Sequence, residues 1–202
     1  LTTKLRRMHA IGYDEVLEHC QKSLEYLDTD YIDLYLVHAP PEDEAHREPV
    51  WRGMEYCLEQ GWVKAIGVSN FGAHHLDMMR SYARYLPAVN QIEMNPWLQR
   101  PALRAATEAI GAKVMAYSPL ARGHKLDDPA LQVIAERLGC TPAQVAIKFC
   151  HEMGCITIPK SSKPERISEN LASLDVDISS EMQAISALEC GYISGWDPTS
   201  EP

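Results

Sequence analysis

Short apolar runs alternate along the chain with longer stretches in which apolar residues recur at helical spacing. Residues that are apolar on both faces of an extended segment are typical of parallel strands covered by helices. Together with residues 1–4, which we interpret as a first strand, the pattern therefore predicts six strands. The other five cover residues 33–38, 64–69, 88–93, 113–118 and 155–159.

The intervening stretches carry the marks of helices. Helical spacing predicts that one face of residues 13–27 is buried, with Val16, Leu17, Cys20, Leu24 and Leu27 on it. Helices are also predicted over 50–60, before Gly61, and over 103–110, before Gly111, because glycine commonly follows a helix end.

Two further features complete the prediction of the helical segments. Thr141-Pro142 reads as a cap followed by proline at the first helical position, and Gly154 ends that helix. We interpret Met78 and Met79 as core or interface filler rather than as a site.

Strand–helix alternation over this length predicts repeated βαβ units, for which an open doubly wound sheet and a closed barrel are both possible. The glycine fingerprint G-x-G-x-x-G, the P-loop and a Tyr-x-x-x-Lys pair are absent from the sequence. Active sites of (β/α)₈ barrels lie at the carboxyl ends of the strands. The barrel is favoured because all six predicted strands end in polar groups: Lys4, His38, Ser69-Asn70, Gln91, Tyr117-Ser118 and Lys160-Ser161.

Composition narrows the function classes. The chain has 202 residues, a net charge of −9 and 46% hydrophobic residues. A net negative charge argues against a nucleic-acid partner. No run of 18 apolar residues occurs, so we expect no membrane span.

Six cysteines lie at 20, 57, 140, 150, 155 and 190, and none forms a C-x-x-C pair. We interpret them as buried thiols of a cytoplasmic protein. Cys150, His151 and Cys155 could hold a metal, but a fourth ligand at zinc-like spacing is missing, so no metal is expected.

Several segments in order resemble aldo-keto reductases. The matching segments are Asp33-Leu34-Tyr35-Leu36-Val37-His38, Gly67-Val68-Ser69-Asn70-Phe71, Asn90-Gln91-Ile92-Glu93-Met94-Asn95-Pro96, Ala116-Tyr117-Ser118-Pro119-Leu120 and Ile158-Pro159-Lys160-Ser161 with the helix that follows. The resemblance runs from Leu1 to about Asp177. It implies a single domain over 1–202 of the (β/α)₈ TIM-barrel type, with about six of eight strand–helix units and the first two missing.

The resemblance also implies chemistry. The family reduces aldehydes and ketones with NADPH, using an Asp, Tyr, Lys and His tetrad in which Tyr donates the proton. Lys4 matches the family Lys, and His38 matches the His that orients the carbonyl. The Asp and Tyr belong to strand–helix units that precede Lys4 in the family and are not in this sequence.

The implied cofactor is NADPH. By resemblance, Ser69, Asn70 and Gln91 bond the nicotinamide carboxamide, Tyr117 stacks on the ring, and Ser118 and Leu120 line the pyrophosphate path. A 2′-phosphate needs positive charge, which an arginine fork supplies well. The remaining expected cofactor residues are Lys160, Ser161, Ser162 and Arg166 for the phosphate, and Glu169 and Asn170 for the adenine.

Two departures affect the substrate. His38-Ala39-Pro40 stands where the family commonly has His-Trp-Pro, and Leu5-Arg6 stands where it has Leu-Trp. The expected partner is a small carbonyl compound, but its identity does not follow from the sequence.

Six strands instead of eight leave two open edges, which can associate with other strands. The chain is therefore a fragment of a longer product, one of two self-associating copies, or a remnant with an open barrel. The first is favoured because the cofactor motifs are intact. A catalytically inactive NADPH-binding or regulatory protein and a partner-binding remnant stay open as rival functions.

Overall fold

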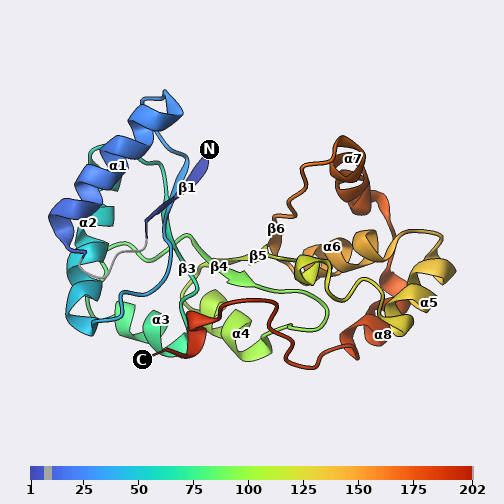
Figure 1. The fold of residues 1–202 in the computed structure, drawn as a ribbon. Coiled ribbons are helices and arrows are strands. Elements are labelled where there is room, and N and C mark those ends of the chain that lie inside the picture. Colours follow the sequence, from blue (N-terminus) through green and yellow to red (C-terminus); the bar gives the residue numbers. More distant parts are fainter. Residues whose placement is uncertain (7–10, 202) are drawn as a thin grey trace. The chain divides into compact units, whose positions relative to one another are not determined.

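A computed structural model describes residues 1–6 and 11–201 and contains strands that alternate with helices (Figure 1). In the described part of the chain, six strands follow one another in sheet order β1-β2-β3-β4-β5-β6. A doubly wound sheet reverses its direction of growth at a switch point, so this sequential order favours the barrel type. The strands are β1 (Thr2–Leu5), β2 (Leu34–Val37), β3 (Ile66–Ser69), β4 (Val89–Glu93), β5 (Lys113–Tyr117) and β6 (Ile156–Thr157).

The helices lie close to the predicted positions. Thr141 caps its helix as expected: its hydroxyl accepts from the backbone N–H of Gln144, and the Gln144 side chain accepts from the backbone N–H of Thr141. The α-helices are α1 (Tyr13–Leu27), α2 (Arg47–Glu59), α3 (Ala73–Met79), α4 (Pro101–Ala109), α5 (Pro129–Leu138), α6 (Pro142–Glu152), α7 (Pro164–Ala172) and α8 (Met182–Ser186). Within the described residues, no helix is long and apolar enough to cross a membrane.

The chain divides into two compact units. The first comprises residues 1–91, 102–113 and 198–202, and the second comprises residues 92–101 and 114–197. A single domain over residues 1–202 stays a prediction.

The core of the first unit lies between its strands and helices α1 and α2. Val16 and Cys20 of α1 are fully buried, as helical spacing predicted. The prediction was wrong for Leu27, which is 40% exposed. The last turn of α1 is exposed throughout, from Glu25 to Asp28, so Leu27 lies beyond the packed part of the helix.

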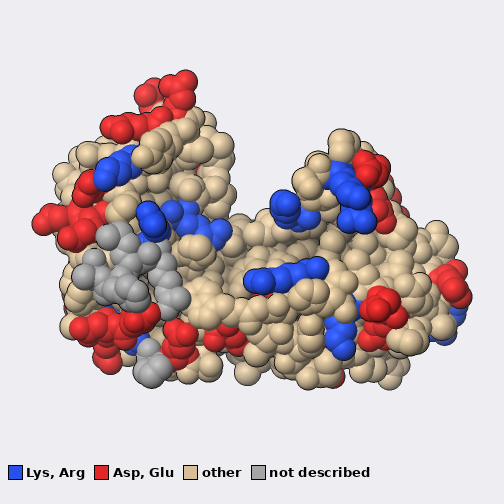
Figure 2. Space-filling view, viewed as in Figure 1, with Lys and Arg blue, Asp and Glu red and all other residues tan. Residues whose placement is uncertain are grey.

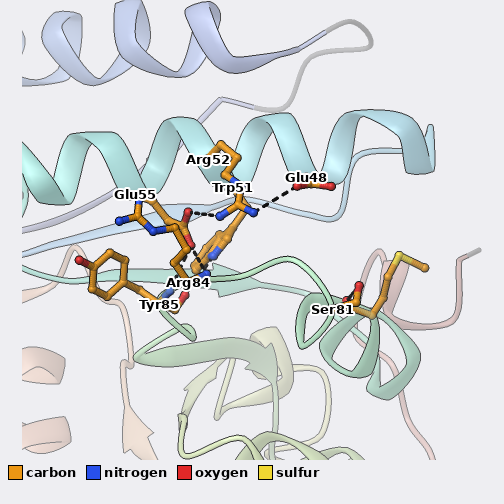
Figure 3. Close-up of polar contacts among 8 residues, drawn as sticks. Glu48, Trp51, Arg52, Glu55, Ser81, Arg84 and Tyr85 are labelled. Atoms are coloured by element: carbon orange, nitrogen blue, oxygen red, sulfur yellow. Dashed lines mark hydrogen bonds and ion pairs between the residues drawn. The ribbon is translucent and has the colours of Figure 1, made fainter.

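The loop that leads into β4 is fixed by a buried carboxylate, Glu55 of α2 (Figure 3). The Glu55 side chain accepts from the backbone N–H groups of Arg84, at 2.6 Å, and Tyr85, at 3.1 Å. Arg52 pairs with its other oxygen at 2.9 Å. The Trp51 indole N–H donates to the Tyr85 carbonyl at 3.0 Å. These bonds set where β4 begins.

The second unit contains β5 and β6 and helices α5 to α8. The strand predicted over 155–159 is shorter than expected, since β6 contains Ile156 and Thr157 alone. Its ladder pairs these residues with Met115 and Ala116 of β5. Pro159 has no N–H to extend the ladder, so Lys160 lies three residues beyond the strand end.

Candidate functional site

The register of the first unit puts four predicted site positions on one face of its strands. Lys4 pairs with Leu36, two residues before His38, and Ser69 pairs with Gln91. Gly67, which lies two residues before Ser69, also pairs with Leu36. Side chains two residues apart on a strand share a face. Lys4, His38, Ser69 and Gln91 therefore lie on the same face, near the carboxyl ends of neighbouring strands.

Gly67 allows these strands to approach closely. A Cβ built on Gly67 lies 2.7 Å from the Leu36 side chain and 2.9 Å from that of Val89. Real Cβ contacts are not this short, so only glycine fits there without a shift of its neighbours. The residue thereby keeps the ends of β2, β3 and β4 close together.

Ser69 and Asn70 form a bonded cluster at these strand ends. The Ser69 hydroxyl donates to the Gln91 carbonyl at 2.8 Å. The Asn70 amide donates to the His38 carbonyl at 3.0 Å and to the Ser69 hydroxyl at 3.2 Å. Ser69, Asn70 and Gln91 are all buried. The structure thus brings three of the predicted cofactor residues together with the backbone of His38.

Asn70 adopts a backbone conformation that few residues adopt. Its φ is 62°, in the left-handed region where asparagine is better tolerated than most side chains. This conformation follows directly after β3 and turns the chain toward α3. The strand-end amide is therefore fixed by both its backbone and its hydrogen bonds.

Lys4 lies within β1 rather than at its end, because β1 continues to Leu5. This corrects the strand prediction of residues 1–4 by one residue. Lys4 is half-buried, and this burial lowers the pKa of its ammonium group from the ordinary value. His38 follows β2 directly and is exposed. It borders a hollow of about 20 Å³ that is also lined by Arg6 and Ala39.

In the second unit, Tyr117 ends β5 and is half-buried. Burial raises the pKa of Tyr117 to about 12, and the neighbouring carboxylate of Glu93 acts in the same direction. The residues that follow form a strained turn: Ser118, Ala121 and Arg122 have φ values of 48°, 45° and 55°. Leu120, in this turn, is half-buried.

The predicted phosphate residues are mostly exposed. Lys160, Ser162 and Arg166 are exposed, and within the described residues Lys160 and Arg166 form no ion pair. The Ser161 hydroxyl accepts from the backbone N–H of Lys163 at 3.1 Å, just before α7 begins. Basic and acidic side chains lie side by side over α7 (Figure 2). Two unpaired cations beside a helix N-terminus suit an anionic group.

Glu169 and Asn170, although adjacent in the sequence, have different neighbours. Glu169 is half-buried and its carbonyl accepts from the Gln144 amide at 3.4 Å. Asn170 is 9% exposed and lines a mainly apolar hollow of about 250 Å³ with Ile167 and Leu171. The hollow lies entirely in the second unit.

The sequence model of the Aldo/keto reductase family matches residues 1–188. The chain is a member of the aldo-keto reductase family. The family predicted from the strand-end motifs is therefore confirmed.

The relatives that the chain resembles include oxidoreductases of Schizosaccharomyces pombe, Bacillus subtilis and Dictyostelium discoideum. The chain is 37% identical over its whole length to an uncharacterized oxidoreductase of Schizosaccharomyces pombe, of which it covers 72%. It is 42% identical to the glyoxal reductase of Bacillus subtilis over 88% of the chain and 64% of that protein.

Solved structures support the fold class. The apo structure of Gox0644 superposes with a TM-score of 0.92 at 37% identity and covers 98% of this chain and 74% of that one. The Bombyx mori aldo-keto reductase AKR2E4, solved in complex with NADP, gives a TM-score of 0.87 at 32% identity, with coverage of 100% and 72%. The predicted α/β fold, with parallel strands alternating with helices, is confirmed.

Sequence reasoning missed a polar cluster around Tyr117 of this aldo-keto reductase. Glu93, which ends β4, is 1% exposed, and Arg100 and Asp197 form an ion pair at 2.9 Å. Burial of Arg100 and Asp197 is nearly complete, with side-chain exposures of 11% and 15%. The one available signal was Glu93 itself, a lone carboxylate in a strand that is buried throughout.

Proposed function

We propose that this aldo-keto reductase chain serves an NADPH-dependent reduction of aldehydes or ketones to alcohols. The observation that carries the proposal is the cluster of Ser69, Asn70 and Gln91, buried and joined by hydrogen bonds where β3 ends beside Gln91 of β4. The silkworm relative, which matches this chain over its whole length and was solved with NADP, supports the choice of cofactor.

Each proposed role follows from the chemistry of the side chain. The amides of Asn70 and Gln91 are suited to pair with a carboxamide, which has both a donor and an acceptor. Their rigid placement fixes the orientation of the nicotinamide ring, and hydride transfer needs such an orientation. Tyr117 offers an aromatic face for stacking, and NADPH supplies the hydride when bound.

Lys160 and Arg166 are proposed to bind the 2′-phosphate, with Ser161 and Ser162 beside them. Their lack of ion-pair partners in the described residues leaves both cations available for a phosphate. Ser118 and Leu120 are proposed to line the pyrophosphate path, and Glu169 and Asn170 to contact the adenine. This distribution favours NADPH over NADH.

Lys4 and His38 are proposed to act at the carbonyl. Both lie on the same strand face as Ser69 and Gln91. His38 is exposed, so its ring can meet a substrate and orient the carbonyl oxygen by a hydrogen bond. Lys4, when protonated, would lower the pKa of the proton-donating Tyr of the family, because positive charge favours the phenolate.

Fluorescence titration with NADPH and NADH tests the proposal. The wild-type chain should bind NADPH more tightly, and Arg166→Ala should weaken NADPH binding about tenfold while leaving NADH unchanged. Lys22→Ala, which removes an exposed cation of α1, is the charge-matched control. Equal affinity for the two cofactors in the wild type contradicts the phosphate assignment.

Turnover with a panel of aldehydes distinguishes a reductase from a catalytically inactive NADPH-binding protein. Oxidation of NADPH that depends on the aldehyde and falls in His38→Ala supports a reductase. Tight NADPH binding without turnover supports the alternative, a catalytically inactive NADPH-binding or regulatory protein. Absence of NADPH binding rejects both.

A further inference from the structure

The last segment of the second unit, residues 190–197, runs along the loops that follow β4 and β5, and we call it the tail strap. The backbone N–H groups of Cys190 and Tyr192 donate to the Trp97 carbonyl at 3.2 and 2.9 Å. The Tyr192 hydroxyl lies 3.1 Å from the His124 ring, and the Lys125 ammonium lies 4.9 Å from the centre of the Tyr192 ring. The strap is thus anchored at its start on both loops.

The middle and end of the strap are fixed to the end of β4. The backbone N–H of Ser194 donates to the Glu93 carboxylate at 3.0 Å. Asp197 pairs with Arg100 at 2.9 Å, and the Arg100 Nε donates to the Glu93 carbonyl at 2.9 Å. Glu93, Ser194, Asp197 and Arg100 therefore form a closed chain of contacts around the strand end.

This chain of contacts adjoins Tyr117. The backbone N–H of Met94, the residue after Glu93, donates to the Tyr117 carbonyl at 3.2 Å. The charges of Glu93, Arg100 and Asp197 all act on the Tyr117 hydroxyl. A change in the strap therefore reaches Tyr117 through groups that already contact or influence it.

The strap also supports the strained turn after Tyr117. A Cβ built on Gly195 lies 2.3 Å from one terminal nitrogen of Arg122, so the guanidinium rests directly on the Gly195 backbone. Arg122, Ala121 and Ser118 all have left-handed backbone conformations. Such conformations persist only where the surroundings enforce them. The strap provides part of that enforcement.

The cluster is not fully satisfied by its own hydrogen bonds. One Glu93 carboxylate oxygen and the Ser194 hydroxyl are buried without a hydrogen-bond partner in the described residues. A polar network left partly unpaired costs stability, so a network kept only for stability is expected to pair fully. This imbalance is typical of a site arranged for another purpose.

We propose that the tail strap, through Glu93, Gly195 and Asp197, positions Tyr117 and residues 118–123 against the nicotinamide half of the cofactor. The proposal rests on the proposed function for the cofactor and adds three positioning residues that act through Tyr117 and Arg122. The anchoring contacts of the strap involve the loops after β4 and β5 and not the phosphate residues Lys160 and Arg166 beside α7. The two halves of the cofactor should therefore respond differently to changes in the strap.

Binding of two ligands separates a positioning role from a structural one. NADP⁺ carries the nicotinamide half, and adenosine 2′,5′-bisphosphate carries the adenine and phosphate half alone. Calorimetric titration of Asp197→Asn and Gly195→Ala should show NADP⁺ bound about tenfold more weakly, because ring orientation is lost. Binding of adenosine 2′,5′-bisphosphate should change by less than about twofold, since its contacts are elsewhere.

Gly195→Ala is a mild variant, because its methyl group displaces only the far end of a flexible arginine. The matched control for Asp197→Asn is Glu181→Gln, which breaks another partly buried carboxylate–arginine pair of the second unit, with Arg137. It should leave the ratio of the two affinities at the wild-type value. Thermal unfolding of each variant identifies any loss of folded protein.

Three results overturn the proposal. Equal weakening of both ligands makes the strap merely structural, and unchanged binding of both shows that it does not reach the ring. A wild-type chain that binds neither ligand rejects the proposed function together with this inference. If the wild type binds both ligands and the strap variants bind them equally well, the inference about the strap is rejected and the proposed function is not.

Discussion

The two groups of candidate cofactor residues differ in how they are held. In the first unit, Ser69 and Asn70 are 1% and 3% exposed and bonded to backbone carbonyls. In the second unit, Lys160 and Arg166 are exposed and form no ion pair within the described residues. Orienting a planar ring requires fixed partners, whereas attracting a phosphate requires only charge nearby. The difference matches the two tasks that the proposed function assigns to them.

The largest expected effect tests how firmly the first unit holds its strand ends. Glu55→Ala removes the buried acceptor of two partly buried backbone hydrogen bonds and should lower the free energy of unfolding by roughly 3 kcal/mol. Chemical denaturation measures the change. Glu48→Ala, which removes an exposed partner of the same Arg52, should cost less than about 0.5 kcal/mol. Similar losses in the two variants would show that the buried carboxylate has no special role.

Asn70 gives a smaller and more local test. Asn70→Ala removes two amide hydrogen bonds and forces a left-handed backbone on alanine, for a loss of about 2 kcal/mol in unfolding free energy. Asn70→Gly loses the same bonds without the backbone penalty and should be about 1 kcal/mol more stable than the alanine variant. If alanine and glycine behave alike, the backbone of Asn70 is not strained.

The smallest expected effect tests whether the second unit also holds one cofactor residue, Tyr117, in a buried position. Tyr117 has a pKa of about 12, as does Tyr82 in the first unit, and burial is the main cause for both. The ordinary tyrosine pKa is about 10. Because the folded state raises the pKa, each tyrosine adds stability that is present below pH 10 and lost between about pH 10 and 12.

Phenolate absorbance during alkaline titration measures this property. The difference in phenolate absorbance between the wild type and Tyr117→Phe should appear only near pH 12. The same is expected for Tyr82→Phe. A Tyr117 that ionises near pH 10 while Tyr82 does not would mean that the end of β5 is open to water. The difference in burial between the candidate cofactor residues of the two units would then include Tyr117.

The sequence predicted the ends of β2 and β3 well, because these strands are apolar until a polar residue ends them. His38 follows β2 directly and Ser69 ends β3, as expected. The rule failed at β4, where Gln91 lies in the middle of a strand that continues to Glu93. The prediction was less accurate where tertiary surroundings decide, as at β6, which contains two residues, and at Leu27, which is exposed in the last turn of α1. The individual roles of the site residues stay predictions.

The tail strap could not be predicted at all. Asp197 is far in the sequence from Glu93 and Arg100, and each of the three residues resembles an ordinary charged residue. Only the fold brings an arginine with a φ of 47° to a carboxylate 97 residues later. Pairings of this kind depend on loop paths, which periodicity does not determine.

The difference in burial among the cysteine thiols allows chemical labelling to detect local opening of the protein. Cys20 and Cys57 are fully buried between α1 and α2, whereas Cys190 is exposed at the start of the strap. The prediction that all six thiols are buried was therefore wrong for Cys190. A maleimide dye should therefore label Cys190 in the native protein and reach Cys20 and Cys57 only when the first unit opens. Labelling of Cys20 and Cys57, followed over time by peptide mass, would report on opening of the first unit, with Cys190 as the internal reference for the reagent.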